Sequence, residues 1–139
     1  MVGWSRRVSH PGAGVLETSL RGPDRLPEVT FEDFAKLDIR VGAVVAAQAF
    51  PEARKPAIKL EIDFGEPLGV LRSSAQLTRH YTPEALVGSE VLAVVNFPPR
   101  RIAGFSSQVL VLGMVNPQDP AEIVLVRPDR SGTQGWRLA

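Results

Sequence analysis

The chain has 139 residues, 44% of them apolar, which predicts a single domain with a hydrophobic core of its own. It contains no cysteine and no apolar run near the ~20 residues of a membrane-spanning helix, so we expect neither thiol chemistry nor membrane insertion. Residues 1–27 hold four of the 16 basic and two of the 15 acidic side chains, which leaves twelve against thirteen in residues 28–139. A nearly neutral domain disfavours a dedicated nucleic-acid binder, because such proteins usually carry a clear basic excess.

Residues 1–27 differ in composition from the rest of the chain. They are rich in Gly, Pro, Ser and Arg without apolar periodicity, which predicts a disordered N-terminal extension. The pair Arg6–Arg7 is not followed by the apolar segment that an export signal needs. We therefore expect a cytoplasmic protein with one folded domain over residues 28–139.

The domain begins with a helix signal and a long strand. Thr30, followed three residues later by Asp33, is typical of a capped helix start and predicts a short helix over residues 31–36. Residues 38–50 predict a long strand, in which Gly42 is expected to mark a bulge or sharp bend.

The next segments alternate strand and turn signals. Residues 58–64 alternate apolar and charged side chains, as a half-buried strand does. A turn then leads to a third strand over residues 70–73. Residues 76–86 predict a helical connection, with Pro83 well placed to begin a helical turn.

Three later segments, residues 91–95, 109–112 and 123–126, are short and rich in β-branched side chains, which predicts strands. Residues 114–122 contain two prolines and an asparagine, so we expect a loop there. Five principal strands with a helix between the third and fourth predict an all-β OB-fold, a Greek-key barrel that binds ligands through its loops.

The loop after the fourth strand is not an ordinary connector. Pro98 and Pro99 lack backbone donors, so a strand ladder must stop there, and Phe97 is biased toward an extended conformation. The loop then mixes two cations with large apolar groups around a flexible glycine: Arg100, Arg101, Ile102, Gly104 and Phe105. Since a plain connector is short and polar, this loop indicates a binding surface.

Three segments carry a resemblance to a known family: LDIRVGAVVAAQAFPEARKPAIKLEIDFG, RSSAQLTRHYTPEALVG and NFPPRRIAGFSSQVLVLG. In this order they resemble the tRNA-binding-domain superfamily, and most closely its CsaA-type export-related chaperones. The resemblance covers about residues 31–128. It implies an OB-fold, a homodimer and a ligand-binding role for the loop after the fourth strand.

The loop keeps part of the pattern found in the tRNA-binding relatives. The retained positions are Asn96, Pro99, Arg100, Arg101, Gly104, Ser107 and Gln108. Pro98 and Ala103 stand where those relatives place cations, and the loss of two charges weakens attraction to phosphate. Phe97, Ile102 and Phe105 supply an apolar surface that suits an extended peptide.

A second marker of the resemblance is the segment around Ser74 and Gln76, which is similar to the CsaA type rather than to the tRNA binders. Two interpretations stay open for these side chains. They contact a ligand, or they cap the helix expected after them.

Nothing in the sequence predicts an enzyme. His10 and His80 lie far apart without a cluster of ligands, so no metal site is expected. Ser73 and Ser74 lack the context of a catalytic serine, and no glycine loop has the spacing that cradles phosphate. We expect no cofactor.

The sequence thus predicts a non-enzymatic, ATP-independent chaperone that binds unfolded or export-bound polypeptides, with the export machinery as a candidate partner through the resemblance. The alternative is a tRNA-binding module that uses the same loop. We also expect a symmetric homodimer, because residues 31–37, 109–115 and 123–126 offer more apolar surface than one small barrel needs to bury.

Overall fold

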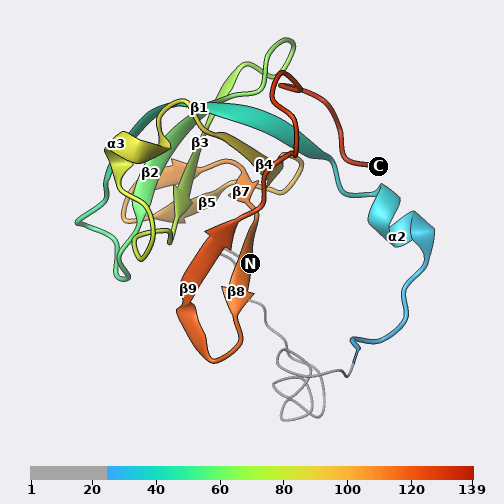
Figure 1. The fold of residues 1–139 in the computed structure, drawn as a ribbon, viewed down its shortest axis with the longest axis horizontal. Coiled ribbons are helices and arrows are strands. Elements are labelled where there is room, and N and C mark those ends of the chain that lie inside the picture. The colour runs from blue at the N-terminus through green and yellow to red at the C-terminus, as the bar shows by residue number, and fades with distance from the viewer. Residues whose placement is uncertain (1–24) are drawn as a thin grey trace.

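The computed structural model describes residues 25–139. The extension expected over residues 1–27 lies outside them except for its last three residues, which are exposed. The described part of the chain forms two short helices and nine strands (Figure 1): α2 (Phe31–Ala35), β1 (Ile39–Ala49), β2 (Ile58–Asp63), β3 (Val70–Ala75), α3 (Pro83–Leu86), β4 (Glu90–Val94), β5 (Arg100–Ile102), β6 (Phe105–Ser107), β7 (Leu110–Val111), β8 (Gly113–Asn116) and β9 (Asp119–Leu125). No helix in this part is long and apolar enough to span a membrane.

Five strands form a nearly closed antiparallel barrel in the order β3-β2-β1-β4-β7. The strands β5 and β6 form one separate hairpin, and β8 and β9 form another, which extends from the barrel in Figure 1. The helix α3 lies between β3 and β4 in the chain. This architecture confirms the predicted all-β barrel of OB-fold type.

The alternation along β2 builds the core, as expected. Ile58, Leu60 and Ile62 are buried, whereas Lys59 and Glu61 between them point outward. Each buried aliphatic side chain contributes about 1.5–3 kcal/mol relative to an exposed one. The apolar run at residues 109–111 is also fully buried in the core, so it offers no surface to a partner.

Gly42 allows close packing, and the bulge that could have marked its position lies further along β1. The register shift of β1 against β2 lies between Val44 and Ala46, beyond the glycine. A Cβ built at Gly42 would lie 2.4 Å from Cγ2 of Ile62 and 2.7 Å from Cε1 of Phe64. Only glycine therefore lets β1 pass so close to these two core side chains.

Two predicted connections differ from the structure. The helical connection expected over residues 76–86 is wrong for its first half, because residues 78–80 form a turn and only Pro83–Leu86 is helical. Thr82 begins this helix by accepting a hydrogen bond from the Ala85 N–H at 3.2 Å. Since proline disfavours a helical residue before it, the helix cannot extend backward through Thr82.

The loop expected over residues 114–122 is wrong, because β8 and β9 pair there as a hairpin. Its turn lies between Asn116 and Asp119, which are register partners. Pro120 lies in β9, which pairs only with β8 in the sheet, and an edge strand tolerates a proline.

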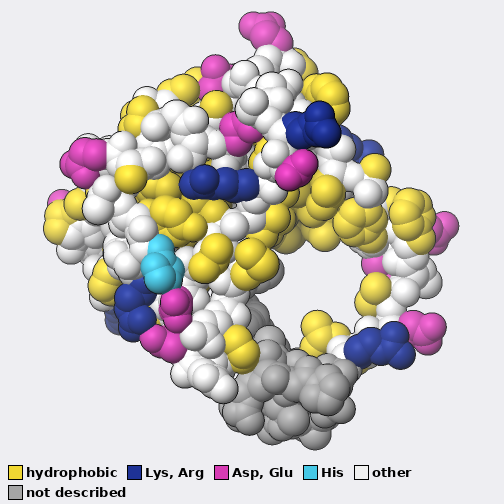
Figure 2. All heavy atoms as spheres, in the orientation of Figure 1, with side chains coloured by type: hydrophobic (Ala, Val, Ile, Leu, Met, Phe, Trp, Pro, Cys, Tyr) yellow, Lys and Arg dark blue, Asp and Glu magenta, His cyan; other side chains and the backbone are white. Residues whose placement is uncertain are grey.

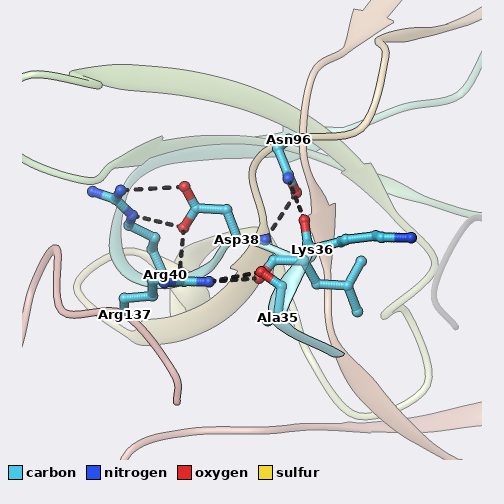
Figure 3. A network of polar contacts seen from close by, with 7 residues as sticks. Ala35, Lys36, Asp38, Arg40, Asn96 and Arg137 are labelled. Atoms are coloured by element: carbon cyan, nitrogen blue, oxygen red, sulfur yellow. Dashed lines mark hydrogen bonds and ion pairs between the residues drawn. The ribbon is translucent and has the colours of Figure 1, made fainter. Parts of the chain in front are cut away.

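The segment at residues 135–138 lies along the first part of β1. Gly135 donates to the Val41 carbonyl at 2.8 Å, and Leu138 donates to the Ile39 carbonyl at the same distance. The side chain of Arg137 donates to the Ala35 carbonyl at 3.0 Å and so reaches the end of α2 (Figure 3). The last described residues thus link the barrel to α2.

Helix α2 confirms the predicted short helix and its cap. The side chains of Thr30 and Asp33 each accept from the other's backbone N–H, which completes a capping box. The two aromatic side chains of this helix lie in different surroundings. Phe34 packs against the core, whereas Phe31 is 76% exposed.

Candidate ligand-binding face

The loop predicted as a binding surface is a small β-hairpin made of β5 and β6. Its two-residue turn is formed by Ala103 and Gly104, whose φ angles of 47° and 82° are both positive. This turn geometry matches the right-handed twist of paired strands. The Arg101 guanidinium donates to the Gly104 carbonyl at 3.1 Å and braces the turn.

The hairpin is fastened to β3 by polar groups that the sequence marked as candidate ligand contacts. The Ser107 hydroxyl accepts from the Ser74 N–H at 3.0 Å, and both residues are buried. Gln108 and Arg72 exchange two bonds. The Gln108 side-chain oxygen accepts from the Arg72 N–H at 2.9 Å, and the Gln108 N–H donates to the Arg72 carbonyl at 2.8 Å. These contacts give Ser74, Ser107 and Gln108 a role in positioning the hairpin.

Phe105 of β6 lies at the centre of a group of side chains that we call the cation–aromatic cluster: Phe50, Lys59, Arg72 and Phe105. The rings of Phe50 and Phe105 meet edge to face with their centroids 5.5 Å apart. The Lys59 ammonium lies 4.5 Å from the Phe50 centroid and 5.3 Å from the Phe105 centroid, and the Arg72 guanidinium lies 5.3 Å from the Phe105 centroid. Each cation is attracted by the negative face of a ring.

The other candidate residues of the hairpin flank this cluster in the chain. Arg100 and Arg101 are exposed, as is Pro99 before them. Phe97, Ile102 and Phe105 are each half-buried, and Ile102 is the register partner of Phe105. By strand alternation Arg100 shares one face of the hairpin with Ile102 and Phe105, whereas Arg101 lies on the opposite face. The hairpin as a whole therefore combines accessible cations with apolar side chains that are only partly covered.

Asn96 has a structural role at the junction of α2 and β1, and its ligand contact stays a prediction. Its side-chain oxygen accepts from the Asp38 N–H at 2.9 Å, and its amide nitrogen donates to the Lys36 carbonyl at 2.8 Å (Figure 3). Arg40 and Arg137 contact the Asp38 carboxylate in the same network. Asn96 thus fixes the junction between α2 and β1.

Ser74 and Gln76 do not cap the helix after them, since Thr82 does so. Gln76 is half-buried just beyond the end of β3. The capping interpretation is therefore wrong, and a ligand contact by Gln76 stays a prediction.

Two contacts between charged or ionisable side chains join the β8–β9 hairpin to the chain between β3 and α3. His80 contacts the Glu122 carboxylate at 2.7 Å, and Arg79 donates to Asp119 at 2.6 Å; Figure 2 shows the histidine against acidic side chains. Hydrogen bonds from Asn116 and His80 hold the pKa of Glu122 below its usual value, and the Arg79 hydrogen bond lowers the pKa of Asp119. Over residues 25–139 no group of three or more potential metal-binding side chains occurs.

Sequence reasoning missed three members of the cation–aromatic cluster: Phe50, Lys59 and Arg72. Lys59 carried a usable signal, because the alternation of residues 58–64 already placed it on the outer face of its strand. Arg72 and Phe50 carried none, since only the folded chain brings them beside Phe105.

Comparison with known proteins agrees with this fold. A family profile described as a putative tRNA binding domain matches residues 39–137. The solved CsaA chaperone of Bacillus anthracis is 51% identical, with a TM-score of 0.76, over 81% of this chain and 100% of that one. The CsaA chaperone of Picrophilus torridus is 44% identical, with a TM-score of 0.73 and the same coverage.

The chain also matches a small part of a longer protein, the methionine–tRNA ligase of Methanococcoides burtonii, with 36% identity over 107 residues. These residues are 77% of this chain and 15% of the ligase, so the likeness concerns one domain of that enzyme. The profile and the end-to-end likeness to the CsaA proteins show that the chain belongs to the tRNA-binding-domain family, within its CsaA-type branch.

Proposed function

We propose that this protein is a non-enzymatic, ATP-independent chaperone that holds unfolded or export-bound polypeptides in the cytoplasm. The observation that carries the proposal is the mixed character of the hairpin and the residues that lead into it, where half-buried Phe97, Ile102 and Phe105 are interspersed along the chain with exposed Arg100 and Arg101. Likeness to CsaA chaperones over their whole length supports it. The link to export rests on the resemblance alone.

In this proposal the apolar side chains of the hairpin, together with Pro99, contact apolar residues of the client. Arg100 and Arg101 bind client carbonyl groups or carboxylates at the rim. Because β5 and β6 are held on β3 by hydrogen bonds, the face is preorganised and loses little conformational entropy on binding.

The test is suppression of aggregation when a denatured reporter enzyme is diluted into buffer, followed by light scattering. Ile102→Asp places a charge among the apolar contacts and is expected to abolish suppression. Val70→Asp is the matched control, because Val70 is an exposed valine at the start of β3, outside the hairpin. Thermal melts of both variants verify folding. Full suppression by folded Ile102→Asp would refute the hairpin as the client site.

The second candidate is tRNA binding through the same hairpin, which the family profile and the exposed Arg100 and Arg101 favour. Salt distinguishes the two ligands. A phosphate-driven complex loses affinity steeply between about 50 and 200 mM salt, whereas apolar peptide binding changes little. If Arg100→Ala with Arg101→Ala abolishes a strongly salt-dependent tRNA complex while Ile102→Asp leaves client holding intact, tRNA is the ligand.

We also propose that the protein acts as a symmetric homodimer. The exposed apolar side chains of Phe31 and Leu138, with Trp136 at 66% exposure, lie on α2 and on the segment that Arg137 joins to it. Figure 2 shows apolar side chains gathered over α2. An isologous interface uses one such patch twice.

Light scattering coupled to size-exclusion chromatography tests the dimer, which is expected at twice the chain mass of 15.1 kDa. Phe31→Asp with Trp136→Asp is expected to shift it to the monomer mass. A wild-type monomer at micromolar concentration would contradict the proposal.

A further inference from the structure

The cation–aromatic cluster brings together four side chains from separate parts of the fold. Phe50 follows β1, Lys59 lies on β2, Arg72 on β3 and Phe105 on β6. Phe50 is only 3% exposed and its ring lies beside the Lys59 ammonium, while Phe105 is half-buried and so partly accessible. An accessible ring therefore lies beside two cations.

The cations are held in place by the rings and by the backbone. A cation beside an aromatic face keeps its charge available to a second partner, because the ring supplies attraction without neutralising the charge. Arg72 is positioned further through its own backbone N–H and carbonyl, which bond to Gln108. A ligand that meets the Phe105 ring would find both positive groups within 5.3 Å of its centroid.

The charges around the cluster suit an isolated anion better than a polyanion. Glu61 is the register partner of Arg72, and both are exposed, so an acidic group flanks the cations on the same sheet. Residues 28–139 carry twelve basic side chains against thirteen acidic ones, which gives no long-range attraction for a chain of phosphates. The two cations that lie within 5.3 Å of the Phe105 centroid are therefore a local positive site, which suits a single carboxylate.

We propose that this cluster is a subsite for a client segment in which an acidic residue adjoins an aromatic or aliphatic one. The carboxylate lies between Lys59 and Arg72, and the neighbouring apolar side chain packs on Phe105. The inference rests on the proposed chaperone function and names the client chemistry that this face prefers.

The experiment measures the affinity of the full chain for three fluorescently labelled, unstructured peptides by fluorescence anisotropy. All alternate Leu and Phe with a polar residue, which is Glu in the first peptide, Gln in the second and Lys in the third. Exposed ion pairs contribute little individually, so two of them predict about fivefold tighter binding of the Glu peptide than of the Gln peptide. The Lys peptide is expected to bind more weakly than both.

Lys59→Met with Arg72→Met removes the charges but keeps long apolar side chains and the backbone bonds to Gln108. This variant is expected to lose the Glu preference while it binds the Gln peptide as wild type does. Arg130→Gln is the matched control, because Arg130 is an exposed cation outside the cluster and its elements. It should retain the preference.

Each outcome decides a different question. Equal affinity of wild type for the Glu and Gln peptides would overturn the inference and leave the chaperone function standing. Absence of all peptide binding would overturn the proposed function itself. If a single-stranded RNA binds more tightly than the Glu peptide and loses affinity in the Lys59→Met, Arg72→Met variant, the cluster is a phosphate site and the inference is wrong.

Discussion

Gly42→Ala tests the packing of the barrel through a single methyl group. The new Cβ would lie 2.4 Å from Cγ2 of Ile62, and both carbons of the Phe64 ring that it meets are within 2.9 Å. Ile62 is 0% exposed and Phe64 is 1% exposed, so neither side chain can turn toward solvent. Gly42 also pairs with Val91 of β4, which prevents β1 from shifting away from them. Overpacking of a core costs about 1–3 kcal/mol.

The loss of glycine offsets part of that cost. Alanine has less backbone entropy to lose on folding, which favours it by roughly 0.5–1 kcal/mol. The net free energy of unfolding is therefore expected to fall by about 1–2 kcal/mol, and Tm by roughly 4–8 °C for a domain of this size. Urea and thermal unfolding followed by circular dichroism measure both quantities.

Ile62→Ala supplies the second side of a double-mutant cycle, since it removes the methyl group nearest to the new Cβ. The double variant should be less destabilised than the sum of the two single variants, because residues in contact couple. Additive losses, or a Gly42→Ala protein as stable as wild type, would refute the reasoning.

Three further predictions concern single side chains. Ser107→Ala leaves the buried Ser74 N–H without its acceptor and should lower the free energy of unfolding by about 1–3 kcal/mol in urea; an unchanged midpoint would show that the bond is replaceable. Ala103→Asn places a residue that tolerates positive φ in the hairpin turn and should raise Tm slightly, which calorimetry detects; a lower Tm would contradict the turn assignment. The folded state lowers the pKa of Glu122, so the ionised carboxylate stabilises the fold. This contribution is fully present above the unfolded pKa of 4.5 and is lost as the pH falls through the lower pKa of the folded state. Glu122→Gln should accordingly reduce the decline of Tm between pH 6 and about 3, and a decline as steep as that of wild type would exclude the contribution.

The sequence predicted the helices and strands that depend on residues close to one another in the chain. The capping box of Thr30 and Asp33 and the alternation of β2 were both readable, because each depends on residues within a few positions of one another. The β8–β9 hairpin was not, since prolines at its turn and on its edge strand resemble a loop in the sequence. A proline is compatible with an edge strand, but β9 is recognised as an edge strand only once the order of strands in the sheet is known.

The candidate site also has one part that the sequence predicted and one part that only the fold shows. The hairpin with Arg100 and Phe105 was evident as an unusual insertion between two apolar runs. Its partners Phe50, Lys59 and Arg72 come from three distant segments, so their meeting depends on barrel closure. Likewise, the amide of Asn96 could not be assigned to the α2–β1 junction before the fold placed Asp38 beside it.

The pairing of residues 135–138 with β1 has a consequence during protein synthesis. β1 is among the first parts of the domain to emerge from the ribosome, whereas the segment that covers its first residues emerges about a hundred residues later. Until then the nascent chain presents an uncovered strand edge that can pair with other chains. A protein proposed to hold unfolded polypeptides is thus itself open to wrong association until residues 135–138 are translated.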